Sequence, residues 1–243
     1  MLSHVDLCSG IGGFALGFQW AGLSKPVMFC DIEPWSRKVL HKHWPDVPIA
    51  EDVKELANDP DRLIPRTDPK RTILTAGYPC QPFSHAGKRL GQEDDRHIWP
   101  YLLQIVAQKR PAWCCFENVY GHVSMGLDQV LFDLEGQGYA SRTFIVPACA
   151  VDAPHRRDRV FVIAKDVSDT DSPRCEEQRR SQPAQAKHQA PQCRSGWLTE
   201  PSVGRVAYGI PKRVDRLRGL GNAIVPQIAM KIGQAIKQCE AEL

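Results

Sequence analysis

The chain has 243 residues, 42% of them hydrophobic, and its 31 Lys and Arg against 28 Asp and Glu give a formal charge of +3. A chain of this length buries a sizeable core but leaves little room for a second full domain, so we expect one α/β domain. A charge of +3 is too small to indicate a nucleic-acid partner by itself.

Membrane, secreted and metal-binding classes are disfavoured. No run approaches the roughly 18 apolar residues of a membrane span, and Asp6 stands where a signal peptide would have its apolar core. We therefore expect a cytoplasmic protein that does not contact membranes. The nine cysteines are odd in number and include no Cys-x-x-Cys pair, which argues against a disulfide framework and a zinc cluster. We expect most of them to be buried as small hydrophobic side chains.

Short apolar runs alternate with amphipathic stretches along the chain. The runs, each bounded by Gly, Pro or a charge, predict buried strands at residues 5–8, 26–30, 72–76 and 113–116, a third strand ending near Asp52, and a late strand at 159–164. Helical spacing predicts helices at residues 14–20, 35–43, 98–109, 127–136 and 225–236. This alternation predicts a parallel, doubly wound sheet.

The composition changes sharply after residue 165. Residues 166–196 contain no Leu, Ile, Met, Phe, Tyr or Trp, and are rich in Gln, Ser, Pro and paired charges. Such a segment cannot bury enough apolar area to offset its ordering entropy, so we expect a flexible surface segment. We expect residues 197–243, where apolar content returns at Trp197, to pack back onto the sheet.

A glycine-rich stretch, residues 6–13, follows the first predicted strand. Glycine permits a tight turn close to a ligand, and the next helix presents free N–H groups. The stretch lacks the Gly-x-Gly-x-x-Gly spacing of dinucleotide folds, and a purely structural turn has a similar composition. Asp31 and Asp52 end the second and third predicted strands, where nucleotide-type folds reach ribose hydroxyls. A solvated acid at the start of a helix is an equally good interpretation of either.

The loop at residues 77–84 follows the strand at 72–76. Pro79 and Pro82 flank Cys80 and restrict the backbone at the edge where ligands bind in such folds. A thiol there is a candidate nucleophile, whereas a structural cysteine more commonly lies within a strand.

Two further clusters of charged and polar residues lie at the ends of predicted strands. Glu117 and Asn118 leave the strand that follows the Cys80 loop, and residues 155–159 deliver three arginines to the late strand. Arginine clusters more often form a solvated surface, but entry into a buried strand favours inward-pointing guanidinium groups.

In this order the motifs resemble those of the C5-specific DNA cytosine methyltransferases, especially their short, phage-like members. The resemblance covers residues 4–165 and 197–238. Its motifs are the S-adenosylmethionine loop at 6–13, the Pro-Cys-Gln loop at 77–84, Glu-Asn-Val at 117–119, Gln-x-Arg-x-Arg with His for Gln at 155–159, and the closing Gly-Asn-Ala at 221–226.

The resemblance implies a Rossmann-like, mostly parallel methyltransferase fold. Residues 1–165 would form the catalytic and cofactor-binding domain, 166–196 would stand in place of a target-recognition domain, and 197–243 would complete the catalytic domain. The implied activity is that of a DNA (cytosine-5)-methyltransferase of the restriction-modification type, acting as a monomer on double-stranded DNA, with S-adenosylmethionine and no metal.

The resemblance also assigns the chemistry. Cys80 would add to C6 of a flipped-out cytosine, and Glu117 would hydrogen-bond or protonate N3. Arg157 and Arg159 would hold the cytosine carbonyl and its developing charge. Asn118 would brace the loop that carries Cys80, in which Pro79 and Gln81 flank the nucleophile.

On the cofactor side, Asp31 would bind the ribose, Ile32 would pack on the adenine, and Asp52 with Val53 would meet the adenine edge. The remaining predicted cofactor contacts are Asp6, Cys8, Ser9, Gly10, Ile11, Gly12, Gly13, Gly77, Pro79, Asn222 and Ala223. Two residues depart from the family pattern: Cys8 replaces a common adenine-stacking aromatic residue, and Asp31 replaces Glu, with Glu33 as an alternative acid for the ribose.

Two alternatives stay open: methylation of RNA, since a related branch of the fold acts on tRNA, and a catalytically silent DNA-binding relative. Basic residues that could contact phosphates are Lys88, Arg89, Arg205, Lys212, Arg213, Arg216 and Arg218. A solvated helix face explains them nearly as well. Because the family reads its target mainly between the arginine motif and the closing motif, the polar segment 166–196 predicts a short target or relaxed specificity.

Overall fold

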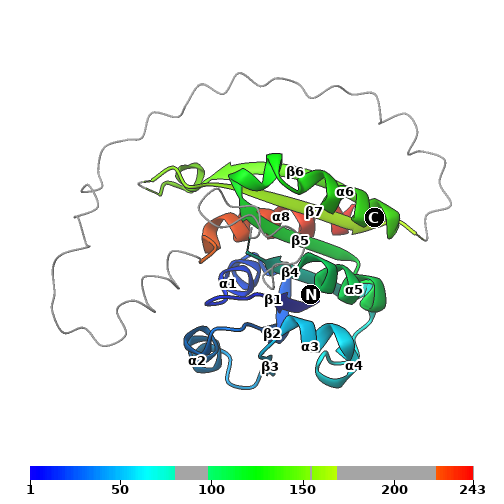
Figure 1. Ribbon diagram of the computed structural model, residues 1–243. Coiled ribbons are helices and arrows are strands. Elements are labelled where there is room, and N and C mark those ends of the chain that lie inside the picture. Colours follow the sequence, from blue (N-terminus) through cyan, green and yellow to red (C-terminus); the bar gives the residue numbers. More distant parts are fainter. Residues whose placement is uncertain (80–97, 154, 169–222, 243) are drawn as a thin grey trace, which may run out of the picture.

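The computed structural model describes residues 1–79, 98–153, 155–168 and 223–242. Within these residues, seven strands form one sheet in the order β3-β2-β1-β4-β5-β7-β6 (Figure 1). The strands are β1 (Leu2–Leu7), β2 (Ser24–Cys30), β3 (Ile49–Ala50), β4 (Thr72–Gly77), β5 (Trp113–Val119), β6 (Tyr139–Pro147) and β7 (Asp158–Asp166). The pairs among β1 to β5 are parallel, whereas β7 is antiparallel to both β5 and β6. The predicted doubly wound, mostly parallel sheet is confirmed.

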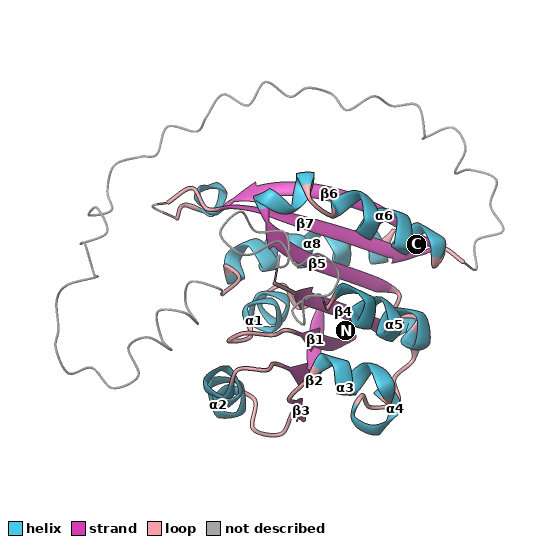
Figure 2. Cartoon of the chain, in the orientation of Figure 1, coloured by secondary structure: helices cyan, strands magenta, loops and turns pink. Residues whose placement is uncertain are grey.

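Helices cover both faces of this sheet (Figure 2). One face carries α1 (Gly13–Trp20), α2 (Pro34–His43) and α8 (Pro226–Ala241). The other carries α3 (Val53–Asn58), α4 (Pro60–Leu63), α5 (Trp99–Lys109) and α6 (Leu127–Gly136). Three short 3-10 turns, η1 (Pro69–Arg71), η3 (Tyr120–Ser124) and η4 (Ala148–Val151), complete the described elements.

The predicted strands and helices all occur, with boundaries that differ by a few residues. The short helices α3 and α4 and the strand β6 were not predicted. β6 lies at the sheet edge and pairs only with β7. Of its residues only Tyr139 is buried, and Phe144 and Ile145 are exposed. An edge strand of this kind lacks the continuous apolar run that predicts a central parallel strand.

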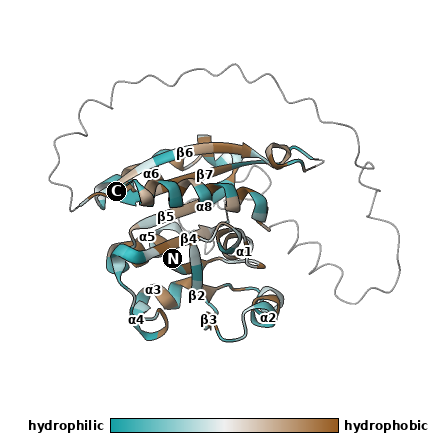
Figure 3. Cartoon of the chain, turned by 180° about the vertical axis from the view of Figure 1, so that it is seen from behind, coloured by the Kyte–Doolittle hydropathy of each residue, from teal (hydrophilic) through white to brown (hydrophobic). Residues whose placement is uncertain are grey.

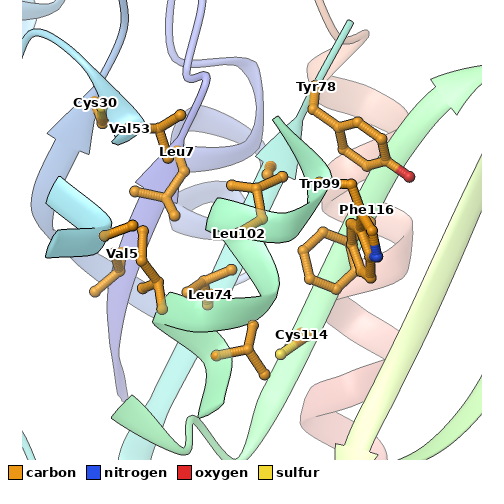
Figure 4. Packing of buried hydrophobic residues seen from close by; sticks show 14 of the residues in the cluster. Val5, Leu7, Cys30, Val53, Leu74, Tyr78, Trp99, Leu102, Cys114 and Phe116 are labelled. Carbon is orange, nitrogen blue, oxygen red and sulfur yellow. The ribbon is translucent and has the colours of Figure 1, made fainter. Parts of the chain in front are cut away.

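The core consists of two layers separated by the sheet. Because successive side chains of a strand point to opposite faces, the adjacent Cys114 and Cys115 enter different layers. Figure 4 shows Leu74, Leu102 and Cys114 in the layer between the sheet and α5. In Figure 3 the strands β5 and β7 are mostly hydrophobic, while α8 shows both kinds of residue, as an amphipathic helix does.

The chain returns to the sheet through α8, which packs against α1. Ile228, Ala229 and Ile232 share a buried cluster with Phe14 and Phe18 of α1. The predicted division at residues 165/166 and 196/197 stays a prediction, because residues 169–222 lie outside the described part. In the described helices, none is long and apolar enough to cross a membrane.

Candidate functional site

The carboxyl ends of β1 to β5 meet at one edge of the sheet, which is where ligands bind in doubly wound folds. The antiparallel β7 starts at the same edge, because Arg159 pairs with Val119 at the end of β5. The sheet therefore gathers four of the predicted motifs: the glycine-rich loop after β1, the start of the Cys80 loop after β4, the acid at the end of β5 and the arginines at the start of β7.

Glu117 and Arg159 form an ion pair at this edge. The Glu117 side chain is almost fully buried, with 8% of the residue exposed, and its Oε1 lies 2.8 Å from Nε of Arg159. The residue opposite Glu117 is Phe161, so the pair is a diagonal contact on one face of the antiparallel strands. Burial raises the pKa of Glu117 to about 7, and the positive charges of Arg159 and Arg157 oppose that rise. Glu117 can thus hold or release a proton near neutral pH.

Arg157 connects the same edge to the returning C-terminal segment. Its guanidinium Nη2 donates to the carbonyl oxygen of Ala223, at 2.8 Å. Its φ of 34° is in the left-handed region, which is unusual for a residue other than glycine. A Cβ on Gly77 would lie 3.1 Å from Cδ1 of Ile224 and 3.4 Å from Oε2 of Glu117, so Ile224 packs beside the acid.

Asn118 contacts the chain just before the predicted nucleophile. Its Nδ2 donates to the carbonyl oxygen of Tyr78 at 3.2 Å, and its Oδ1 accepts the N–H of Val119 at 2.8 Å. Pro79 is exposed at the end of the described segment. Cys80 and Gln81 lie outside the described residues, and so does Asn222.

The glycine-rich loop is held by contacts to the end of β2. Oδ2 of Asp31 accepts the N–H of Gly10 at 2.7 Å, and its Oδ1 accepts the N–H of Glu33 at 2.9 Å. Ser9 donates its hydroxyl to the carbonyl of Asp6 at 2.5 Å. Burial is the largest influence on Asp31 and raises its pKa, against these two backbone hydrogen bonds. Asp31 therefore connects the loop after β1 to the loop after β2. Each of its carboxylate oxygens has a further lone pair that can accept a hydrogen bond from a ligand.

Two glycines of this loop are required by their surroundings. Gly12 has φ of 84°, and a Cβ there would lie 2.6 Å from the Trp44 ring. A Cβ on Gly13 would lie 2.6 Å from the carbonyl oxygen of Ile224. The first helix thus begins in direct contact with the C-terminal segment.

Asp6 and Cys8 lie differently from the other loop residues. The Asp6 carboxyl is fully buried, where its Oδ1 accepts the hydroxyl of Thr75 at 2.6 Å, and burial raises its pKa to about 7. Cys8 is partly buried with φ of 49°, and burial raises its pKa well above the usual value. A contact from Asp6 to a ligand would need its main chain, since the carboxyl points into the protein. Their predicted cofactor contacts stay predictions.

The residues predicted to bind adenosine line a separate part of the edge. Ile32 is 70% exposed, so its apolar side chain is open to solvent at this edge. Asp52 caps α3 by accepting the N–H of Lys54 at 2.8 Å, and the side chain of Val53 is buried in the core. Ile32 and Asp52 border a cavity of about 630 Å³ between α2, β3 and α4, which is within the usual size of a ligand pocket.

Arg37 lines this cavity and was not predicted as a site residue. Its Nη1 donates to the carbonyls of Asp31 and Ile32 at 3.1 and 2.8 Å, and its Nη2 lies 3.2 Å from Oε2 of Glu51. It fixes the ends of β2 and β3 relative to one another. A basic residue in a helix that follows an acidic strand end was the available signal, but that pattern is common on solvated helices.

Four of the described cysteines, Cys8, Cys30, Cys114 and Cys115, do not compete with Cys80 as nucleophiles. Burial raises the pKa of each of them, and a thiol held protonated is inert. Of the six described cysteines, Cys30, Cys114 and Cys115 are buried, Cys8 and Cys149 are partly buried and Cys239 is exposed. In the described residues, no three His, Cys, Asp or Glu side chains form a group that could hold a metal.

Comparisons with known proteins agree on one family. The chain is 34% identical over 172 residues to the type II methyltransferase M2.BsuMI of Bacillus subtilis (strain 168), covering 66% of this chain and 41% of that protein. It is 31% identical over 166 residues to the type II methyltransferase M.MspI of Moraxella sp, covering 66% of this chain and 38% of that protein. The chain thus spans less than half the length of these two relatives.

Solved structures show the same fold. The DNMT2 E260A/E261A/K263A mutant of Spodoptera frugiperda is 23% identical, with a TM-score of 0.57 over 70% of this chain and 51% of that one. Dnmt2 methyltransferase of S. pombe is 22% identical, with a TM-score of 0.58 over 78% of this chain and 58% of that one. The family model described as C-5 cytosine-specific DNA methylase matches residues 2–198. Because this match spans most of the 243 residues, the chain belongs to the C-5 cytosine-specific DNA methylase family.

Proposed function

We propose that this protein transfers a methyl group from S-adenosylmethionine to C5 of cytosine in double-stranded DNA, through a covalent adduct with Cys80. The observation that carries the proposal is the buried Glu117–Arg159 pair, which lies beside the start of the Cys80 loop and near the glycine-rich loop. An acid with a pKa near 7 in this position has the protonation range that cytosine activation needs.

The chemistry follows from the poor nucleophilicity of cytosine C5. The Cys80 thiolate forms a bond to C6, the C5–C6 π electrons shift into the ring, and N3 takes the proton of Glu117. Arg159, and with it Arg157, stabilises the charge on the cytosine carbonyl. C5 is then nucleophilic enough to take the methyl group from the sulfonium of bound S-adenosylmethionine, which would leave as a neutral thioether. Water would take the C5 proton, the electrons of the C5–H bond would restore the C5–C6 double bond and expel the Cys80 thiolate, and N3 would return its proton to Glu117. Because C6 is hidden in a duplex, the base must first be flipped out, at a cost of a few kcal/mol.

The residues at the edge fit S-adenosylmethionine, which when bound supplies the methyl group as a sulfonium. The exposed Ile32 offers an apolar face for an adenine, and the neighbouring cavity is large enough for a nucleoside. Asp31 lies at the end of β2, where this fold presents an acid to a ribose. A Cβ built on Gly10 would meet nothing within 4 Å, which leaves open space above the loop.

We propose duplex DNA as the partner of a monomeric, cytoplasmic enzyme. The family description and the type II methyltransferases to which the chain is similar support the DNA partner. The basic residues predicted to contact phosphates, 88–89 and 205–218, lie outside the described residues. Their contribution is measurable as a fall in DNA affinity with rising salt.

Labelled cofactor tests the activity directly. Purified protein is incubated with S-[methyl-³H]adenosylmethionine and either cytosine-containing duplex DNA or tRNA, beside a Cys80→Ala variant. We expect label in 5-methylcytosine of the duplex with wild type and none with Cys80→Ala. Label in tRNA alone would assign the RNA activity, and no label in either would overturn both.

A duplex containing 5-fluorocytosine separates a silent relative from an active enzyme. The C5 fluorine cannot leave as a cation, so the adduct persists and is seen as a protein–DNA band that survives denaturation. We expect this band with wild type and its absence with Cys80→Ala. A DNA-binding protein without catalysis would shift native DNA and give no such band.

A further inference from the structure

Tyr78 is the residue that joins the end of β4 to the Cys80 loop, and its side chain turns into the core. Only 6% of the residue is exposed. Its ring centroid lies 5.6 Å from that of Trp99 and 6.4 Å from that of Phe116, and Figure 4 shows the three rings together beside β5. An aromatic ring held in this way fixes the backbone from which it projects.

The Tyr78 hydroxyl meets a second buried polar group. Its oxygen lies 3.0 Å from Nε2 of His122, and the two rings meet edge to face at 5.7 Å. His122 belongs to η3, directly after β5, and is also 6% exposed. Burial lowers the pKa of His122, so the imidazole is neutral and offers one donor and one acceptor. Whichever of the two groups donates, the hydrogen bond gives a partner to one buried polar atom of each residue.

The same segment holds the main chain of Tyr78. Asn118 donates to its carbonyl oxygen at 3.2 Å. The segment 118–122 therefore forms hydrogen bonds with both the backbone and the phenol of Tyr78. Glu117 directly precedes that segment. Pro79 separates Tyr78 from Cys80, and its fixed φ also restricts the residue before it. The backbone of Tyr78 and Pro79 therefore has little conformational freedom.

We propose that Tyr78 and His122 are positioning residues that fix the start of the Cys80 loop relative to Glu117. The inference rests on the proposed methyltransferase activity. The nucleophile must approach C6 while the acid contacts N3 of the same ring, and a misplacement of about 1 Å costs roughly 100-fold in rate. The hydrogen bond between Tyr78, at the end of β4, and His122, after β5, fixes the start of the Cys80 loop at a set distance from Glu117.

Tyr78→Phe removes the hydroxyl and keeps the ring. We expect kcat and the rate of adduct formation on 5-fluorocytosine duplex to fall by about 10-fold to 100-fold. The KM for S-adenosylmethionine should stay within about 2-fold of wild type, because Asp31, Ile32 and Asp52, which are predicted to hold the adenosine, lie on other loops. His122→Leu should give the same fall. His122→Gln, whose amide can still pair with the phenol, should recover most of the rate.

Tyr139→Phe is the matched control. Tyr139 is also buried, and its hydroxyl donates to the carbonyl of Pro111 at 2.8 Å, at the opposite end of the sheet. Both substitutions remove one buried tyrosine hydroxyl, so thermal unfolding should show a similar loss of stability in both variants. Only Tyr78→Phe should lower the rate of adduct formation.

The outcomes separate this inference from the proposed function. Wild-type protein that forms no adduct overturns the methyltransferase activity and this inference with it. Wild type that forms the adduct, with Tyr78→Phe equally fast, overturns this inference alone. An equal slowing by Tyr139→Phe, or a folded His122→Gln as slow as His122→Leu, also overturns it, because the effect would then come from general destabilisation or from lost packing.

Discussion

Glu117 is subject to two opposing electrostatic influences. Its burial disfavours the carboxylate, and the guanidinium groups of Arg159 and Arg157 favour it; burial prevails, and the pKa rises to about 7. The acid is therefore able to donate a proton near neutral pH, where an ordinary glutamate is already ionised.

The first prediction concerns the pH dependence of methylation. If Glu117 donates to N3, only its protonated form is active, so kcat/KM should fall as pH rises through about 7. Glu117→Gln should lower kcat by about 10² to 10⁴-fold and remove this descending limb. Initial rates from pH 5.5 to 9 with labelled cofactor measure both. A limb of unchanged midpoint in Glu117→Gln would assign it to another group.

The second prediction concerns the partner of that acid. Arg159 lowers the pKa of Glu117, so Arg159→Gln should raise that pKa and move the descending limb to higher pH. It should also reduce kcat, because the guanidinium no longer stabilises the charge that develops on the cytosine carbonyl. The control is Arg156→Gln, since Arg156 is largely exposed and pairs with Asp158. It should leave the midpoint in place, and an equal shift in both variants would mean that overall charge, rather than the ion pair, sets the pKa.

At the scale of the elements, α8 packs closely against α1 in the N-terminal half of the chain. A Cβ on Gly17 of α1 would lie 2.3 Å from the carbonyl oxygen of Pro226 and 2.6 Å from Cβ of Ala229. The two helices cross at a residue without a side chain, which brings the backbone of α8 against α1. Ala223 and Ile224, just before α8, lie beside Arg157 and Glu117, so this helix packing also supports the site.

The third prediction tests that crossing. Gly17→Ala should destabilise the protein by about 1–3 kcal/mol, because the added methyl overlaps backbone that cannot retreat cheaply. Gly136→Ala is the control, since a Cβ at the end of α6 meets nothing within 4 Å, and it should be neutral or stabilising by up to about 1 kcal/mol. Urea unfolding monitored by circular dichroism gives both values; equal midpoints for the two variants would contradict the close approach.

At the scale of the whole molecule, the predicted site residues gather at one edge of the sheet. The seven strands of the described residues form one sheet, and this edge carries both the loops predicted to hold the cofactor and the Glu117–Arg159 pair. The chain spans 41% of M2.BsuMI and 38% of M.MspI. Between the arginine motif and the closing motif it has the polar segment 166–196, which its composition predicts to be flexible. Base-edge contacts need positioned side chains, and a flexible segment offers few of these until it folds on DNA.

The fourth prediction follows from that segment. Plasmid DNA methylated by the purified protein and then sequenced after bisulfite conversion should show methylated cytosines in a short or loosely defined context. Untreated plasmid in the same run is the control for complete bisulfite conversion. A long, strictly defined site would contradict the prediction.

Local patterns were enough to predict most of the elements. The apolar runs that became β1, β2, β4 and β5 are buried on both faces, so their composition predicts a strand without reference to neighbours. β6 has no such signal, because an edge strand leaves part of its apolar surface exposed. α3 and α4 are six and four residues long, too short for a helical repeat to be recognised.

The sequence by itself determined the fold class, the motifs and the residue types of the site, because each depends on side chains within a few positions of one another. Only the tertiary structure decided which of them meet. Arg159 reaches Glu117 because β7 runs antiparallel to β5, Asp31 holds Gly10 across 21 positions, and Tyr78 finds His122 across 44. Such contacts depend on strand order and register, which the packing of the whole sheet fixes and no local pattern encodes.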